Sequence, residues 1–371
     1  MKRFVVLAAA LALAAPAAGA VPHVHARAYL VENAGTNDVL AARNVRRHVP
    51  IASLTKLMTV LLTLERTNPS AVVAVAPAAA AVGESSIALA PGERITVREL
   101  LEGALIQSAN DAADALAYYL GHGSMSRFVA MMNARARQLA LTDTHFARPD
   151  GLDAPGHYSS ARDITKLARL VMAHRLARQI VRQRTATLAD GEVLHTWNDL
   201  LGTFPGVFGV KTGHTSAAGW NEVAGVARNG VVLYATLLGS PDRSTRNDDL
   251  AALLRWGLSR YRRVAVIQSD RVYAKVALGY GKGKLGLVAQ APVWKGIRVD
   301  RPLVQRVVAQ ASTPLPVLRG QPLGRVVVRQ DARVIASSPL VAIRTVRRPG
   351  ALGRVGFYAG RTVSHIWGWV R

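Results

Sequence analysis

A serine and a lysine three residues apart open the apolar stretch PIASLTKLMTVLLTLE, residues 50–65. A serine hydroxyl is a weak nucleophile unless a neighbouring base takes its proton. Lys56 follows Ser53 by about one helical turn, and apolar surroundings would lower the pKa of its ammonium group enough to make it such a base. The N-terminal end of a helix also favours a developing negative charge. The pair therefore indicates a nucleophile and its base; taken alone, a helix start with an exposed lysine is the alternative.

Two further short motifs follow in the chain. QSANDAAD contains Ser108 and Asn110, and FGVKTGHT contains Lys211, Thr212 and Gly213. Ser-x-x-Lys, Ser-Asp-Asn and Lys-Thr-Gly are the motifs that class A β-lactamases and penicillin-binding proteins share. Here alanine occupies the central position of the second motif. Each motif alone is weak, but the ordered set predicts one active site.

Together with the flanking residues SLTKLMT and HTSAAGWN, the set resembles the low-molecular-mass penicillin-binding proteins, specifically the D-alanyl-D-alanine carboxypeptidases. The resemblance covers about residues 27–260 and continues more loosely to the C-terminus. It implies an α+β fold: a penicillin-binding, β-lactamase-like transpeptidase domain, in which an antiparallel sheet packs against a helical cluster. A small all-β domain and a C-terminal amphipathic segment follow it.

The resemblance also implies a role for each catalytic residue. Ser53 attacks the peptide bond between the two terminal D-alanines of a peptidoglycan stem peptide, which forms an acyl-enzyme. Lys56 accepts the serine proton. Ser108 relays a proton to the leaving amine, and Asn110 contacts the substrate amide or holds Lys56 in place.

The third motif implies the substrate-binding side of the site. Lys211 and Thr212 meet the terminal carboxylate of the substrate. Gly213 lets the substrate backbone approach the strand closely. The backbone amides of Ser53 and His214 form the oxyanion hole, where losing one donor typically costs ~10²–10³ in rate.

The expected activity is that of a serine DD-carboxypeptidase that trims stem pentapeptides and is itself acylated by penicillin and other β-lactams. The alternatives are a DD-endopeptidase that cuts D-alanyl crosslinks and a noncatalytic protein that binds the cell wall or the membrane. A β-lactamase is less favoured, because residues 110–211 contain no Glu-x-x-Leu-Asn segment. We expect no metal and no cofactor, since the chain has no cysteine and its histidines lack the HExxH spacing.

The elements that must position these residues follow from the hydrophobic pattern. Residues 50–65 have no polar stripe, which predicts a buried helix. Strands are expected at 28–33 and 38–43 and again from about 204, with Asn229-Gly230 as a hairpin turn. The region 97–186 is mostly helical in pattern, and residues 248–263 form a closing helix. This order predicts an antiparallel sheet built from both ends of the domain.

The ends of the chain indicate export. Residues 1–20 have a basic start, an apolar stretch and a small-residue end, which is typical of a signal peptide; an uncleaved anchor is the alternative. We expect the peptidase domain at 21–262, a β-rich domain at 263–346 and a basic amphipathic tail at 347–371. The tail predicts a membrane anchor, with a helix or strand docked on the protein as the alternative.

The charge is concentrated in the last part of the chain. From residue 262 to 371 there are 20 lysines and arginines against three aspartates and no glutamate. An exported basic region favours an anionic membrane surface over nucleic acid as a partner. The expected location is periplasmic, with peripheral attachment to the inner membrane.

Overall fold

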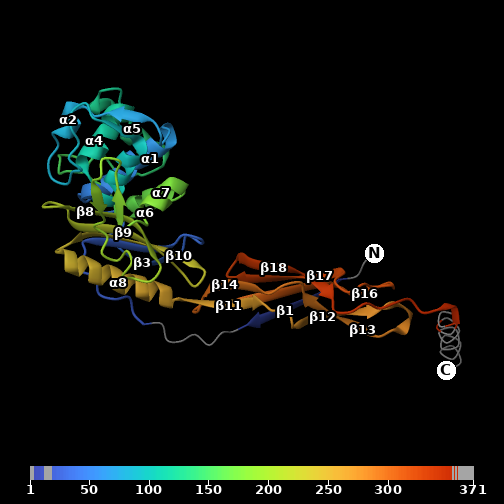
Figure 1. Ribbon diagram of the computed structural model, residues 1–371. Coiled ribbons are helices and arrows are strands. Elements are labelled where there is room, and N and C mark those ends of the chain that lie inside the picture. The colour runs from blue at the N-terminus through green and yellow to red at the C-terminus, as the bar shows by residue number, and fades with distance from the viewer. Residues whose placement is uncertain (1–3, 12–18, 353–354, 356, 358–371) are drawn as a thin grey trace. The chain divides into compact units, whose positions relative to one another are not determined.

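The structure, a computed structural model, describes residues 4–11, 19–352, 355 and 357 (Figure 1). They form two compact units. One comprises residues 19–259 and combines helices with an antiparallel sheet, while the other contains residue 260 onward with strand β1 (Phe4–Leu11) and is rich in strands. This composition confirms the predicted α+β class. No helix within the described ranges is long and apolar enough to span a membrane.

The sheet of the first unit has five antiparallel strands and joins both ends of that unit's chain, as the sequence predicted. Asn229 and Gly230, with φ of 55° and 75°, make the tight turn between its last two strands. In spatial order the strands are β3 (Val39–Arg43), β2 (Ala28–Asn33), β10 (Val231–Ser240), β9 (Gly219–Arg228) and β8 (Val207–Thr215). Two small hairpins accompany the sheet: β4 (Val72–Ala74) with β5 (Arg94–Thr96), and β6 (Thr185–Thr187) with β7 (Val193–His195).

Helices cover both faces of this sheet (Figure 1). The first of them is buried from Lys56 to Thr63, which confirms the predicted buried helix. The helices are α1 (Lys56–Arg66), α2 (Pro77–Ala80), α3 (Val97–Glu102), α4 (Asn110–Leu120), α5 (Met125–Gln138), α6 (Ala161–Val171), α7 (Arg175–Ile180) and α8 (Arg243–Ser259). Figure 1 shows α8 on the face opposite to the cluster that contains α1 and α4.

The prediction of the closing helix was wrong at both ends. Helix α8 begins at Arg243, five residues before the predicted start at residue 248, because the Asp242 carboxylate accepts from the Thr245 backbone amide (2.8 Å). The helix ends at Ser259, and the next residues belong to strand β11 (Tyr261–Ile267).

The second unit contains a seven-stranded sheet and a two-stranded one. Alternate residues are buried in strands such as β15 (Leu303–Gln310), so one face of the strand packs on a core. The order of the large sheet is β1, β15, β17 (Pro322–Gln330), β18 (Arg333–Ala342), β13 (Lys284–Ala289), β12 (Val272–Leu278) and β16 (Ser312–Thr313). A short 3₁₀ turn, η3 (Gly279–Gly281), links β12 and β13, and β14 (Val293–Arg298) pairs with β11.

Strand β1 lies within the stretch for which the sequence predicts a signal peptide, and it pairs antiparallel with β15. Most of the predicted amphipathic tail, residues 347–371, lies outside the described residues.

Candidate active site

Ser53 lies in a short 3₁₀ turn, η1 (Ala52–Thr55), that leads directly into α1. The sequence predicted that Ser53 would begin the helix, but the regular helix begins at Lys56. The turn starts with Ala52 in the left-handed region, at a φ of 49°. The hydroxyl of Thr55 closes it by donating to the Ala52 carbonyl oxygen (2.8 Å). The nucleophile candidate is thus held by a compact turn wedged between α1 and the sheet.

Lys56 is fully buried, and its Nζ has three hydrogen-bond partners. They are Ser53 Oγ at 2.9 Å, Asn110 Oδ1 at 2.6 Å and the Asp150 carbonyl oxygen at 2.7 Å. A neutral amine has two protons and one lone pair. When two protons go to Asn110 and Asp150, the lone pair faces Ser53, which is the arrangement that a general base needs.

The charge state of Lys56 is set by its surroundings. Burial lowers the pKa of the ammonium group to about 8, and the carboxylates of Asp150 and Asp114 limit this decrease. Roughly a tenth of the lysine is therefore neutral at pH 7. Burial and the nearby Asp150 carboxylate raise the pKa of Asp114 to about 7, so Asp114 itself titrates near neutral pH.

The second motif enters the site through an irregular piece of backbone. A π-helical segment, η2 (Gly103–Gln107), follows α3. The next residue, Ser108, has a φ of 65°. Helix α4 then begins at Asn110. This break directs two side chains from one short segment to different partners: Asn110 accepts from Lys56, and Ser108 Oγ accepts from Lys211 Nζ at 2.7 Å.

The third motif lies on β8, beside the turn that carries Ser53. The Lys211 side chain is buried and also donates to the Thr212 carbonyl oxygen (2.8 Å). Burial, and then the positive charge of Lys56, lower the pKa of Lys211 well below its usual value. A bound anion would raise this pKa again, so this end of the site favours a carboxylate.

Position 213 requires a glycine for a second reason, in addition to the close approach of the substrate backbone. A Cβ at this position would lie 2.9 Å from the Ser53 backbone nitrogen and 3.1 Å from that of Leu54. The strand can therefore approach the nucleophile turn only because residue 213 has no side chain.

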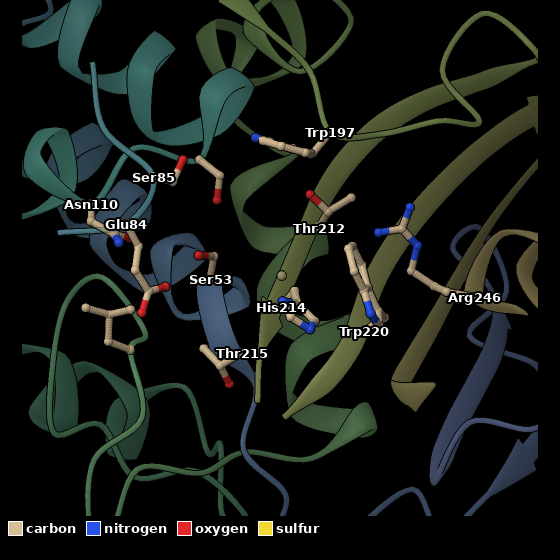
Figure 2. A pocket seen from close by; sticks show the side chains of 13 residues that line it. Ser53, Glu84, Ser85, Asn110, Trp197, Thr212, His214, Thr215, Trp220 and Arg246 are labelled. Atoms are coloured by element: carbon tan, nitrogen blue, oxygen red, sulfur yellow. The ribbon is translucent and has the colours of Figure 1, made fainter. Parts of the chain in front are cut away.

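One pocket of about 210 Å³ collects the motif residues (Figure 2). Six of the eight predicted site residues line it: Ser53, Ser108, Asn110, Thr212, Gly213 and His214. The other two, Lys56 and Lys211, lie behind this wall and reach it through Ser53 and Ser108. The structure therefore brings all eight predicted residues to a single site. No group of three or more potential metal ligands occurs in the described part of the chain.

The comparisons with known proteins agree with this geometry. The family model of the D-alanyl-D-alanine carboxypeptidases, peptidase family S11, matches residues 15–242. The chain belongs to this family. It is therefore a serine-type hydrolase of the S11 carboxypeptidases.

The similarity to individual family members covers most of the chain. D-alanyl-D-alanine carboxypeptidase DacD of Salmonella typhimurium is 31% identical over 384 residues, covering 96% of this chain and 98% of that protein. DacF of Bacillus subtilis is 31% identical over 342 residues, covering 88% and 87%. Among solved structures, penicillin binding protein 5 of Haemophilus influenzae is 27% identical with a TM-score of 0.63, covering 88% of this chain and 99% of that one.

Some residues of this S11 site were missed by the sequence analysis. They line the same pocket: Glu84, Ser85, Leu152, Trp197, Thr215, Trp220 and Arg246. Thr215 and Trp220 fall within the quoted flanking stretch HTSAAGWN, and the others carry no local signal. Those others come from loops and from α8, which the motifs do not mark.

Arg246 is the most informative of the missed residues. Its side chain is 1% exposed, yet it lines the pocket together with Trp220 and Thr212 (Figure 2). Its guanidinium pairs with Glu222 (3.2 Å) and with Asp199 (3.0 Å). Burial raises the pKa of Glu222 to about 7 despite this cation. Arg246 therefore adds a guanidinium group to the Lys211 end of the pocket.

The loop after α5 forms another wall of the pocket through Leu152. Asp150 and Asp153 both make specific contacts there. The Asp150 carboxylate pairs with Arg148 (2.6 Å), and its backbone carbonyl accepts from Lys56. Asp153 accepts from the Thr215 hydroxyl on β8 (2.8 Å). The loop is thereby tied to the lysine and to the sheet edge.

Proposed function

We propose that this protein is a serine DD-carboxypeptidase that removes the terminal D-alanine from peptidoglycan stem pentapeptides through an acyl-enzyme on Ser53, and that penicillin acylates the same serine. The observation that carries the proposal is the Lys56 Nζ, which lies 2.9 Å from Ser53 Oγ while two buried acceptors occupy its other protons. In its neutral form, Lys56 can therefore accept the proton of this hydroxyl.

In the acylation step, Ser53 Oγ attacks the carbonyl carbon between the two terminal D-alanines, and its proton passes to the neutral Lys56. The backbone amides of Ser53 and His214 stabilise the oxyanion that forms. The C–N bond then breaks as Ser108 gives its proton to the amine of the departing D-alanine. Ser108 is reprotonated by the proton that Lys56 took from Ser53, which leaves Lys56 neutral for the next step. Ser108 suits this role because it lies on the pocket wall and is hydrogen-bonded to buried Lys211.

In the deacylation step, water attacks the ester carbonyl and releases the shortened peptide. The proton of the water passes to Lys56, and Ser53 Oγ regains a proton as the ester bond breaks. Lys56 can serve both steps because Asn110 and Asp150 keep its lone pair directed toward Ser53.

The substrate end is recognised by charge. A stem peptide ends in a free carboxylate, and Arg246 lines one end of the pocket. Buried Lys211 lies behind Ser108 at this end, where a bound carboxylate would raise its pKa and favour its charged form. Thr212 adds a hydroxyl that can donate to the same carboxylate. A peptide that continues past the terminal residue would lack this charge there, which favours carboxypeptidase over endopeptidase activity.

The test is to incubate the protein with a stem pentapeptide that ends in D-Ala-D-Ala and to follow the mass of the peptide. We expect loss of one alanine residue with the wild type and none with Ser53→Ala. The matched control Ser337→Ala, at an exposed serine on β18, should be as active as the wild type. An intact pentapeptide together with cleavage of a crosslinked dimer would instead support the endopeptidase.

We also propose that residues 1–20 are a signal peptide and that the protein works outside the cytoplasmic membrane. N-terminal sequencing of the exported protein should then start after about residue 20, whereas a chain that starts at Met1 would contradict the proposal. The boundaries 21–262 and 263–346 for the peptidase and β-rich domains, and 347–371 for the tail, belong to the same proposal.

The tail and the basic β-rich region are proposed to hold the protein at an anionic membrane surface. Their positive charge supports this, since each basic residue near an anionic bilayer contributes about 1 kcal/mol. Deletion from Gly356 onward should release the protein from membranes. If the truncated protein sediments as before, the tail is not the anchor.

A further inference from the structure

The peptide group between Ala52 and Ser53 links the nucleophile turn to the oxyanion hole. In a planar trans peptide the carbonyl of Ala52 and the N–H of Ser53 point in opposite directions. Whatever fixes the Ala52 carbonyl therefore also fixes the direction of the Ser53 N–H. This fixation is needed, because Ala52 has a φ of 49°, which is unfavourable for a residue with a side chain.

A chain of three hydrogen bonds ends on that carbonyl. The Ala147 backbone amide donates to Nδ1 of His157 (3.0 Å), and Nε2 of His157 lies 2.7 Å from Thr55 Oγ1. The Thr55 hydroxyl donates to the Ala52 carbonyl oxygen (2.8 Å). Thr55 and His157 are 0% and 6% exposed, so water does not compete for these bonds.

Every donor in this chain is determined. Because a backbone N–H can only donate, Nδ1 of His157 must present its lone pair to Ala147. The neutral ring then carries its proton on Nε2, which must donate to Thr55 Oγ1. Burial lowers the pKa of His157 to about 4, so the ring is neutral at pH 7. The Thr55 proton is left with one direction, toward Ala52.

The surrounding loop is fitted to the same carbonyl. Gly151 approaches it so closely that a Cβ there would lie 2.1 Å from the Ala52 oxygen and 2.9 Å from Thr55 Oγ1. The backbone at Gly151 therefore packs directly against the Ala52 carbonyl and the Thr55 hydroxyl. On the β8 side, the backbone at Gly213 packs against the Ser53 nitrogen.

We propose that His157 and Thr55 are positioning residues for the oxyanion hole: through the Ala52 carbonyl, they hold the Ser53 N–H in the direction that stabilises the oxyanion. Neither side chain touches the substrate. This role rests on the proposed function, because it matters only if Ser53 is acylated.

The test compares two matched pairs of variants. Thr55→Val keeps the shape of the side chain and removes its hydroxyl, whereas Thr55→Ser keeps the hydroxyl. His157→Phe removes both ring nitrogens, whereas the amide of His157→Gln can still accept from Ala147 and donate to Thr55. Each full-length variant is acylated with penicillin, and the rate, the melting temperature and the infrared stretching frequency of the acyl-ester carbonyl are measured.

We expect Thr55→Val and His157→Phe to slow acylation about 10- to 100-fold, less than the ~10²–10³ that follows outright loss of an oxyanion donor. The carbonyl band should move to higher wavenumber in both, because the acyl oxygen loses a well-directed hydrogen bond. Thr55→Ser and His157→Gln should largely restore both rate and band position. The double variant Thr55→Val with His157→Phe should be no slower than the slower single variant, since both break one chain.

Two results would overturn the proposal. An unshifted carbonyl band in Thr55→Val and His157→Phe, with rates that follow the melting temperature alone, would make the two residues purely structural. A wild-type protein that forms no adduct with penicillin would instead overturn the proposed function, and this role with it. The two failures are distinguished by the wild-type reaction.

Discussion

The pH dependence of acylation by penicillin reports the protonation state of Lys56. The lysine can accept the Ser53 proton only in its neutral form, so the acylation rate must rise with pH. Burial lowers the pKa of Lys56 to about 8, which places the midpoint of that rise near pH 8. An exposed lysine would place it above pH 10.

The size of the rise follows from the neutral fraction. With a pKa of about 8, roughly 1% of Lys56 is neutral at pH 6 and about half at pH 8, a rise of roughly 50-fold that then levels off. With an ordinary lysine pKa of about 10.4, the rate would still rise roughly 70-fold between pH 8 and pH 10. The two cases therefore differ most clearly above pH 8.

The assay is stopped-flow or quench measurement of the second-order acylation rate constant from pH 5.5 to 10, with Asp114→Asn beside the wild type. The carboxylate of Asp114 raises the pKa of Lys56, so its removal should move the midpoint to lower pH. Asp190→Asn, at an exposed loop position, is the matched control and should leave the profile unchanged. A wild-type rate that keeps rising to pH 10, or a midpoint that moves to higher pH in Asp114→Asn, would refute this explanation of the base.

Three further predictions concern packing, recognition and stability. Gly213→Ala should slow acylation about tenfold or more, because the new Cβ would lie 2.9 Å from the Ser53 nitrogen and would displace this oxyanion donor. Gly350→Ala, with open space around it, is the control in the same kinetic assay. Arg246→Gln should lower kcat/KM about 10- to 100-fold for a pentapeptide with a free carboxylate, which corresponds to the free energy of one hydrogen bond to a charged group. The variant should have little effect on kcat/KM for the same peptide with a C-terminal amide. Equal losses for the two peptides would contradict the role of this pocket-lining cation. Leu287→Ala, at a fully buried position, should destabilise the β-rich unit by about 2–5 kcal/mol in calorimetry while the acylation rate stays unchanged, and a parallel loss of acylation would show that the units do not act independently.

The motifs and the strongest hydrophobic patterns were sufficient to predict the centre of the site. Ser-x-x-Lys, Ser-x-Asn and Lys-Thr-Gly converge in space because each marks a different element, and the apolar run from residue 50 correctly indicated a buried helix. Asn229-Gly230 predicted its turn because both residues tolerate positive φ. These signals are local, so the sequence shows them directly.

Other parts of the site depend on contacts that no local pattern encodes. Arg246 can be buried because its guanidinium pairs with the carboxylates of Glu222 and Asp199, whereas a lone arginine in a helix is normally expected at the surface. The left-handed Ala52 cannot be predicted from an alanine, which usually avoids that region. Thr55 and His157 are 102 residues apart in the sequence, so their hydrogen bond appears only in the folded chain.

The most direct test of the central claim is to locate the penicillin adduct. After reaction and digestion with trypsin, the peptide His48–Lys56, HVPIASLTK, contains Ser53 as its single serine. We expect this peptide to gain the mass of one penicillin molecule, with fragmentation placing the mass on Ser53, and we expect no gain in Ser53→Ala. An adduct on another peptide, or an equal adduct in Ser53→Ala, would contradict the assignment of the nucleophile.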